Sequence, residues 1–241
     1  MPSILRRIVR RLISRQEVAP GWKRKANVLE TAIDFAIANN IAGDYLEFGV
    51  FQGRSFTHAY NYFHSRFRRY AGDRDGEFTE YRRQVERMRF IAFDSFEGLP
   101  AVAQENLPLH WRGPAAMKCP KDQFSDNIAK AGVKLSDVRM VEGFYDRSLT
   151  EACKSSLQVT TGAIFHVDCD LYESTVQVLD FITSLIQDGS VIVFDDWFYY
   201  RGHPERGEQG AFRQWLRKNP KLVASELCAL CPAAAFIINL P

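Results

Sequence analysis

Residues 162–196 read GAIFHVDCDLYESTVQVLDFITSLIQDGSVIVFDD, and this stretch decides the fold. Two nearly all-apolar runs, 162–168 and 190–196, each end in aspartates. Between them, residues 172–187 repeat apolar side chains at the spacing of a helix face. Apolar strands that alternate with helices are typical of a parallel sheet buried on both faces. The stretch therefore predicts an α/β fold.

The same alternation extends in both directions from this unit. Apolar runs predict strands at 43–50, 89–94 and 138–143, and helical spacing occurs at 27–40 and 55–63. The C-terminal part departs from this alternation. Its two β-rich segments, KLVASELCAL and AAAFIINL, lie close together around a proline, as two antiparallel strands would.

The composition is that of an ordinary globular protein. The chain has 241 residues, of which 46% are hydrophobic and 25% charged, so one α/β domain with a large core is the simplest expectation. No apolar run approaches the ~20 residues of a membrane-spanning helix, and the N-terminus lacks the apolar region of a signal peptide. Five scattered cysteines suit a reducing compartment, and we therefore expect a cytoplasmic protein.

The basic residues are concentrated at the N-terminus. Residues 1–25 contain eight Lys or Arg and one acid, and we interpret them as a basic arm that precedes a domain at 26–241. Packing of this arm on its own domain or a partner subunit is favoured over attachment to anionic lipid. Nucleic-acid binding is disfavoured because no basic surplus exists elsewhere. Within the domain, 66–89 is interpreted as a charged insertion and 95–122 as a long loop that serves as a lid.

Polar residues gather where the predicted strands end. Ligands of open α/β sheets bind beyond the carboxyl ends of the strands, so these residues are the candidates for a site. The first strand leads into glycines at 49 and 53, and Asp94 closes the next strand. An acid at that position can accept hydrogen bonds from the two hydroxyls of a ribose. Taken alone, the glycine segment is equally consistent with a tight turn and a helix N-cap.

Six segments, in order, resemble the macrocin O-methyltransferase family of class I S-adenosylmethionine-dependent enzymes. They are YLEFGVFQGRS, FDSFEGLP, EGFYDRSL, FHVDCDLYEST, VIVFDDW and GEQGAFRQWL, and together they span residues 44–216. The resemblance implies a Rossmann-like fold with a mostly parallel seven-stranded sheet, helices on both faces and an antiparallel C-terminal strand. It also implies methylation of a hydroxyl on a small molecule, with a sugar or glycoside as the expected acceptor, and a homodimer or larger homo-oligomer.

The resemblance further implies roles for particular residues. S-adenosylmethionine is expected to bind with its methionine part at the glycine turn, at Glu47, Gly49, Gly53 and Ser55. Asp94 is expected at its ribose, and Ser95 and Gly143 near its adenine. Mg²⁺ is expected at Asp168, Asp195 and Asp196, with Asp170 as the general base. A divalent cation would offset carboxylates that otherwise repel one another. Related catechol-type enzymes have a lysine base where this chain has Leu171, so that mechanism is excluded at this position.

Two other classes of function compete with this interpretation. The DCD segment at 168–170 also fits the metal-binding DxD of a nucleotide-sugar glycosyltransferase or, less well, a phosphatase nucleophile loop. Neither explains Glu47, Gly49 and Asp94. A non-catalytic protein that keeps the cofactor pocket is the third candidate, and loss of a metal aspartate would mark it. All three aspartates are present.

Overall fold

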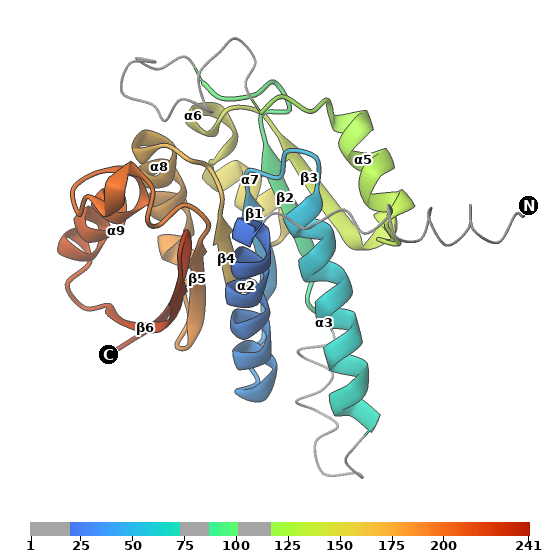
Figure 1. Cartoon of the computed structure of the whole chain (residues 1–241), viewed down its shortest axis with the longest axis horizontal. Helices are drawn as coiled ribbons and strands as arrows, with labels where there is room; N and C mark the ends of the chain where they lie inside the picture. The colour runs from blue at the N-terminus through green and yellow to red at the C-terminus, as the bar shows by residue number, and fades with distance from the viewer. Residues whose placement is uncertain (1–19, 73–86, 101–116) are drawn as a thin grey trace, which may run out of the picture.

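The structure, a computed structural model, describes residues 20–72, 87–100 and 117–241. Its centre is a seven-stranded sheet in the order β3-β2-β1-β4-β5-β7-β6 (Figure 1). β7 runs antiparallel to both of its neighbours, β5 and β6, so the other six strands point the same way. The strands are β1 (Asp44–Phe48), β2 (Phe90–Asp94), β3 (Val138–Glu142), β4 (Gly162–Val167), β5 (Ser190–Phe194), β6 (Val223–Leu230) and β7 (Ala233–Asn239).

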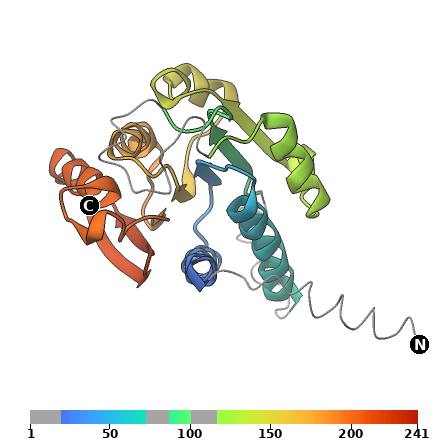
Figure 2. The same ribbon diagram turned by 45° about the horizontal axis from the view of Figure 1, so that its top comes forward.

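Helices cover both faces of the sheet (Figure 2). One face carries α2 (Pro20–Ala38), α3 (Arg54–Gly72) and α5 (Lys121–Lys130). The other carries α6 (Tyr145–Ser148), α7 (Glu151–Leu157), α8 (Tyr172–Ile182) and α9 (Gly207–Lys218). Short 3₁₀ turns lie at Leu135–Asp137, Thr183–Leu185 and Tyr200–Gly202. The predicted α/β fold, its seven strands and its antiparallel C-terminal strand are confirmed.

The alternation of side chains along the central strands produces two separate cores. In β5, Val191 and Val193 pack with α2 and α3, whereas Ile192 and Phe194 pack with α8 and α9. Every residue of β4 and β5 is buried, which explains why both read as continuous apolar runs. Each large apolar side chain buried in this way contributes about 1.5–3 kcal/mol. The two cores fix the positions of the strand ends between the helix layers.

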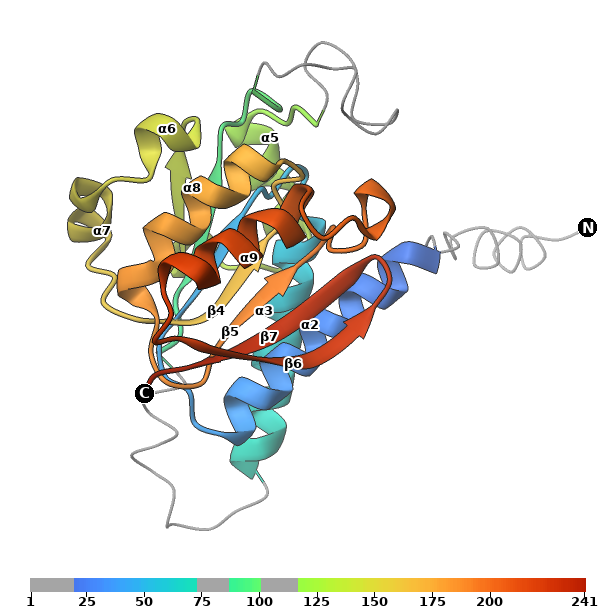
Figure 3. The same ribbon diagram turned by 90° about the vertical axis from the view of Figure 1, so that its left-hand side faces the viewer.

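Helix α2 lies along the sheet beside the C-terminal hairpin of β6 and β7 (Figure 3). It begins at Pro20, so the boundary expected between residues 25 and 26 falls inside this helix. The first part of the expected insertion, 66–72, continues α3. The segments 1–19, 73–86 and 101–116, which include most of the arm, of the insertion and of the lid, lie outside the described residues. No helix in the described part of the chain is long and apolar enough to cross a bilayer.

Candidate active site

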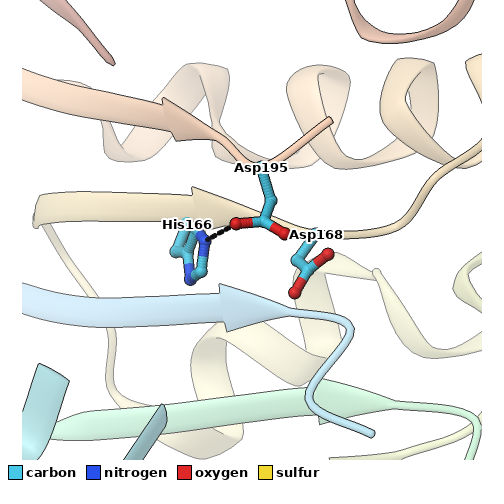
Figure 4. A group of neighbouring side chains, drawn as sticks. All are labelled: His166, Asp168 and Asp195. Carbon is cyan, nitrogen blue, oxygen red and sulfur yellow. Dashed lines mark ion pairs between the residues drawn. The ribbon is translucent and has the colours of Figure 1, made fainter. Parts of the chain in front are cut away.

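Four aspartates meet at the carboxyl ends of β4 and β5, which are neighbours in the sheet. His166, Asp168 and Asp195 place ligand atoms within 4.8 Å of one another, and so do Asp168, Asp170 and Asp196. Figure 4 shows Asp195 reaching from the end of β5 toward His166 and Asp168 of the β4 segment. The sequence-predicted metal residues and the predicted base are therefore brought together.

A line of hydrogen-bonded groups connects this cluster to the turn after β1. The Ser55 hydroxyl donates to Glu47 Oε1 over 2.6 Å, and the Tyr45 hydroxyl donates to Glu47 Oε2. His166 Nδ1 lies 3.3 Å from Glu47 Oε2, and its Nε2 lies 3.6 Å from Asp195 Oδ1. Burial alone would lower the pKa of His166, but Glu47 and Asp195 raise it well above its usual value. The imidazole of His166 thus lies between two buried carboxylates.

The residue that approaches the aspartates from outside the sheet is Lys25 of α2. Its Nζ donates to Asp195 Oδ2 and, over 3.0 Å, to Asp196 Oδ1. Burial acts to lower the pKa of Lys25, yet Asp195, Asp168 and Asp196 together raise it above its ordinary value. Lys25 therefore carries a positive charge at the centre of the cluster.

The aspartates differ in how readily they give up a proton. Burial acts to raise the pKa of Asp195, but hydrogen bonds and charge from His166 and Lys25 lower it to about 2. The pKa of Asp168 is raised by burial and by the charge of Asp195. Burial and the neighbouring Asp196 also raise the pKa of Asp170. Asp168 and Asp170 therefore both hold a proton more readily than Asp195 does.

The turn between β1 and α3 is held by Asp94 at the end of β2. Asp94 Oδ2 accepts the backbone N–H groups of Val50 and Phe51 at 2.8 and 3.1 Å, and Oδ1 accepts that of Phe96 at 2.7 Å. Gly49 has a φ of +88°, and a Cβ atom there would lie 1.9 Å from the Asp168 carbonyl oxygen. Only glycine lets this turn approach the end of β4 so closely.

A cavity of about 480 Å³ lies between the glycine turn and the aspartates. A volume of this size suits a small-molecule ligand. Its lining includes five of the predicted site residues, namely Gly49, Asp94, Ser95, Asp168 and Asp170.

The other predicted residues lie outside this lining. Glu47 is fully buried and, with Ser55, belongs to the hydrogen-bonded line behind the turn. Gly53 packs against α5, where an added Cβ would lie 2.5 Å from Ile128. Gly143 follows β3, and its N–H donates to the carbonyl oxygen of Asp94. Asp195 and Asp196 contact Lys25 beside the cavity.

Sequence analysis assigned no role at the site to Lys25, Tyr45 or Glu208. Glu208, in the first turn of α9, is 2% exposed, and its Oε2 accepts the backbone N–H of Asp196 over 3.0 Å. Its Oε1 has no hydrogen-bond partner among the residues that the structure describes. Tyr45 could have been found from strand alternation, because it shares a sheet face with Glu47.

Residues 78–214, more than half of the chain, match the family model for macrocin-O-methyltransferase (TylF). The chain belongs to this family. The family resemblance is thereby confirmed, and the matched range runs from before β2 into α9 and contains all four aspartates.

Two curated relatives of this macrocin O-methyltransferase family member are O-methyltransferases by name. An 8-demethyl-8-(2,3-dimethoxy-alpha-L-rhamnosyl)-tetracenomycin-C 4'-O-methyltransferase of Streptomyces olivaceus is 27% identical over 183 residues, 73% of this chain. A demethyldecarbamoylnovobiocin O-methyltransferase of Streptomyces niveus is 25% identical over 189 residues, also 73% of this chain. In both cases the match spans 61% of the relative's length.

The fold is shared with solved methyltransferases. The structure of the O-methyltransferase NovP superimposes with a TM-score of 0.65 at 18% identity, covering 89% of this chain and 79% of NovP. With the strand order and the antiparallel β7, this likeness confirms the class I methyltransferase fold.

Proposed function

We propose that this protein is an S-adenosylmethionine-dependent and Mg²⁺-dependent O-methyltransferase that acts on a hydroxyl of a sugar or glycoside. The observation that carries the proposal is the single cavity bordered by Gly49 and Asp94 on one side and by Asp168 and Asp170 on the other. A methyl donor at the glycine turn and a hydroxylated acceptor at the aspartates would share this space. Family membership and the names of the two Streptomyces relatives support the same reaction and acceptor class.

The donor set at the strand ends fits a divalent cation. Carboxylate oxygens are the ligands that Mg²⁺ prefers, and Asp168 lies within ligand distance of Asp195 in one group of side chains and of Asp196 in another. The chemistry that Mg²⁺ supplies when bound is Lewis-acid polarisation of a hydroxyl, which lowers its pKa. Glu208 holds the backbone of Asp196 and so orients one of the three proposed ligands.

Asp170 is the proposed general base. It lines the cavity, and its carboxylate lies beside those of Asp168 and Asp196, where a hydroxyl held at the proposed metal would reach it. Asp170 would accept the proton of the acceptor hydroxyl as that oxygen attacks the sulfonium methyl group. The oxygen–methyl bond forms, the sulfur–methyl bond breaks, and S-adenosylhomocysteine leaves. Proper alignment of the two reactants is the main contribution of the surrounding walls.

Asp94 is the proposed ribose ligand. Its carboxylate accepts the N–H groups of the glycine turn and also faces the cavity. One side chain would therefore both shape the turn and bind the ribose hydroxyls of the cofactor. The homo-oligomeric state and the cytoplasmic location stay predictions from the sequence.

Two measurements test the proposed function. Calorimetry with S-adenosylhomocysteine should detect binding without added metal, because the glycine turn and Asp94 are separate from the proposed metal ligands. Methyl-labelled S-adenosylmethionine should then transfer label to members of a panel of glycosides with adjacent free hydroxyls, only when Mg²⁺ is present. No binding of S-adenosylhomocysteine at millimolar concentration would refute the methyltransferase proposal.

A further inference from the structure

The ammonium group of Lys25 lies against the same aspartates that are proposed to hold the metal. Its Nζ contacts Asp195 and Asp196, and Asp168 also acts on it electrostatically. The side chain of Lys25 is 19% exposed, and those of Asp195 and Asp196 are 6% and 4% exposed. This pairing is therefore shielded from water, unlike an ordinary surface ion pair.

Lys25 is delivered to the cluster by a firmly packed helix. Ala26, Val28 and Leu29, which follow it in α2, are all buried in the core between this helix and the sheet. The other two basic residues of this turn, Lys23 and Arg24, are exposed. Of the three basic residues, Lys25 is the one that the helix directs toward the carboxylates. Its position therefore reflects a specific contact and not a general excess of basic charge.

A lysine ammonium and a divalent cation compete for the same two carboxylates. Their charges repel each other, and the repulsion is strong over short distances away from bulk water. We propose that Lys25 is a built-in counter-ion of the metal-binding aspartates, which the divalent cation must displace from Asp195 and Asp196. This inference rests on the proposed function, since it concerns the metal affinity of the same site.

A counter-ion of this kind has a physical purpose in the metal-free protein. Buried carboxylates at the ends of β4 and β5 repel one another when no cation separates them. Lys25 provides compensating charge, and its contact on one side, with that of His166 on the other, holds Asp195 in place. The Tyr199 ring, 5.9 Å from the Lys25 ammonium, lies where the displaced group can still contact an aromatic face. The result is a preformed site whose metal affinity is kept low.

The test measures by calorimetry how tightly Mg²⁺ binds to the full-length, chelator-treated wild type and to three variants. Lys25→Met removes the charge while it keeps an unbranched side chain, and Lys23→Met removes an exposed charge two residues away. We expect Lys25→Met to bind Mg²⁺ at least about tenfold more tightly than the wild type. Lys23→Met should stay within about twofold, and Lys25→Arg, which keeps the charge, should not gain affinity.

A second measurement uses the wild-type chain and does not depend on the folding of a variant. Labelling by a lysine-reactive reagent, quantified by peptide mass spectrometry, should increase at least about threefold at Lys25 when Mg²⁺ is saturating. Labelling of Lys23 should stay constant. Equal Mg²⁺ affinity in the wild type and Lys25→Met, or unchanged labelling of Lys25, would overturn the inference alone. Absence of Mg²⁺ binding in both proteins would overturn the proposed metal site and this inference with it.

Discussion

Replacing Gly49 by alanine should damage both the stability of the protein and its cofactor site. The new Cβ would lie 1.9 Å from the Asp168 carbonyl oxygen, so the two segments must separate by about 1.5 Å to reach an ordinary 3.4 Å contact. Such overpacking costs about 1–3 kcal/mol. The φ of +88° adds about 1 kcal/mol for a side chain in this conformation. We therefore expect a loss of about 2–4 kcal/mol in the free energy of unfolding.

Gly202→Ala is the matched control for this variant. Gly202 also has a positive φ, +65°, but an added Cβ there meets no atom within 4 Å. Its cost should be limited to about 1 kcal/mol of backbone strain. Urea unfolding followed by circular dichroism measures both losses, and calorimetry measures S-adenosylhomocysteine affinity, which should fall only in Gly49→Ala. The reasoning is refuted if the two variants unfold at the same urea concentration and bind the ligand equally well.

Three further predictions concern single side chains. Asp94→Ala removes the acceptor of the glycine-turn N–H groups, so calorimetry should show at least about tenfold weaker S-adenosylhomocysteine binding. Asp168→Asn should weaken Mg²⁺ binding. Asp170→Asn should keep metal and cofactor affinity and lower kcat by about 10²–10⁴-fold. An equal loss of Mg²⁺ affinity in the two variants would exclude Asp170 as the base. The hydrogen bond from the Tyr60 hydroxyl lowers the pKa of Asp137 in the folded protein below its ordinary value of 3.8. The stabilisation from this hydrogen bond is therefore fully present above pH 3.8 and is lost as the pH falls through the pKa that Asp137 has in the folded protein. Tyr60→Phe should therefore lower Tm by about 2–4 °C at pH 6, and this difference should vanish in strong acid, which thermal melts at several pH values can contradict.

The strands could be predicted because they depend on local pattern, whereas the roles of the four aspartates were implied by the family resemblance. The runs that became β4 and β5 are apolar on both faces, and parallel strands place their carboxyl ends at one edge. Glu47 and His166 are direct partners across the neighbouring strands β1 and β4. That pairing depends on the register between the two strands, which local pattern does not fix. The role of Glu47 as a buried partner of His166 and Ser55, outside the cavity lining, was therefore not foreseen.

Lys25 could not be found in this way, because its position depends on how α2 lies across the sheet. It is 170 residues from Asp195 in the chain, and no periodicity connects them. The charge of residues 1–25 assigned Lys25 to the basic arm with its exposed neighbours, and the predicted end of that arm falls inside α2. Glu208 is a similar case, since an acid in the first turn of a helix ordinarily faces water and interacts with the helix dipole. Its burial follows only from the packing of α9 against the end of β5.

The ring of His166 gives this protein a natural spectroscopic reporter. Its two nitrogens face different partners, Glu47 on the side of the glycine turn and Asp195 on the side of the aspartate cluster. The nitrogen resonances of an isotope-labelled imidazole are sensitive to each of these contacts separately. Ligand binding at the turn would perturb Nδ1, and cation binding at the cluster would perturb Nε2. One side chain, with no added probe, would thus record the order in which the two halves of the site are filled.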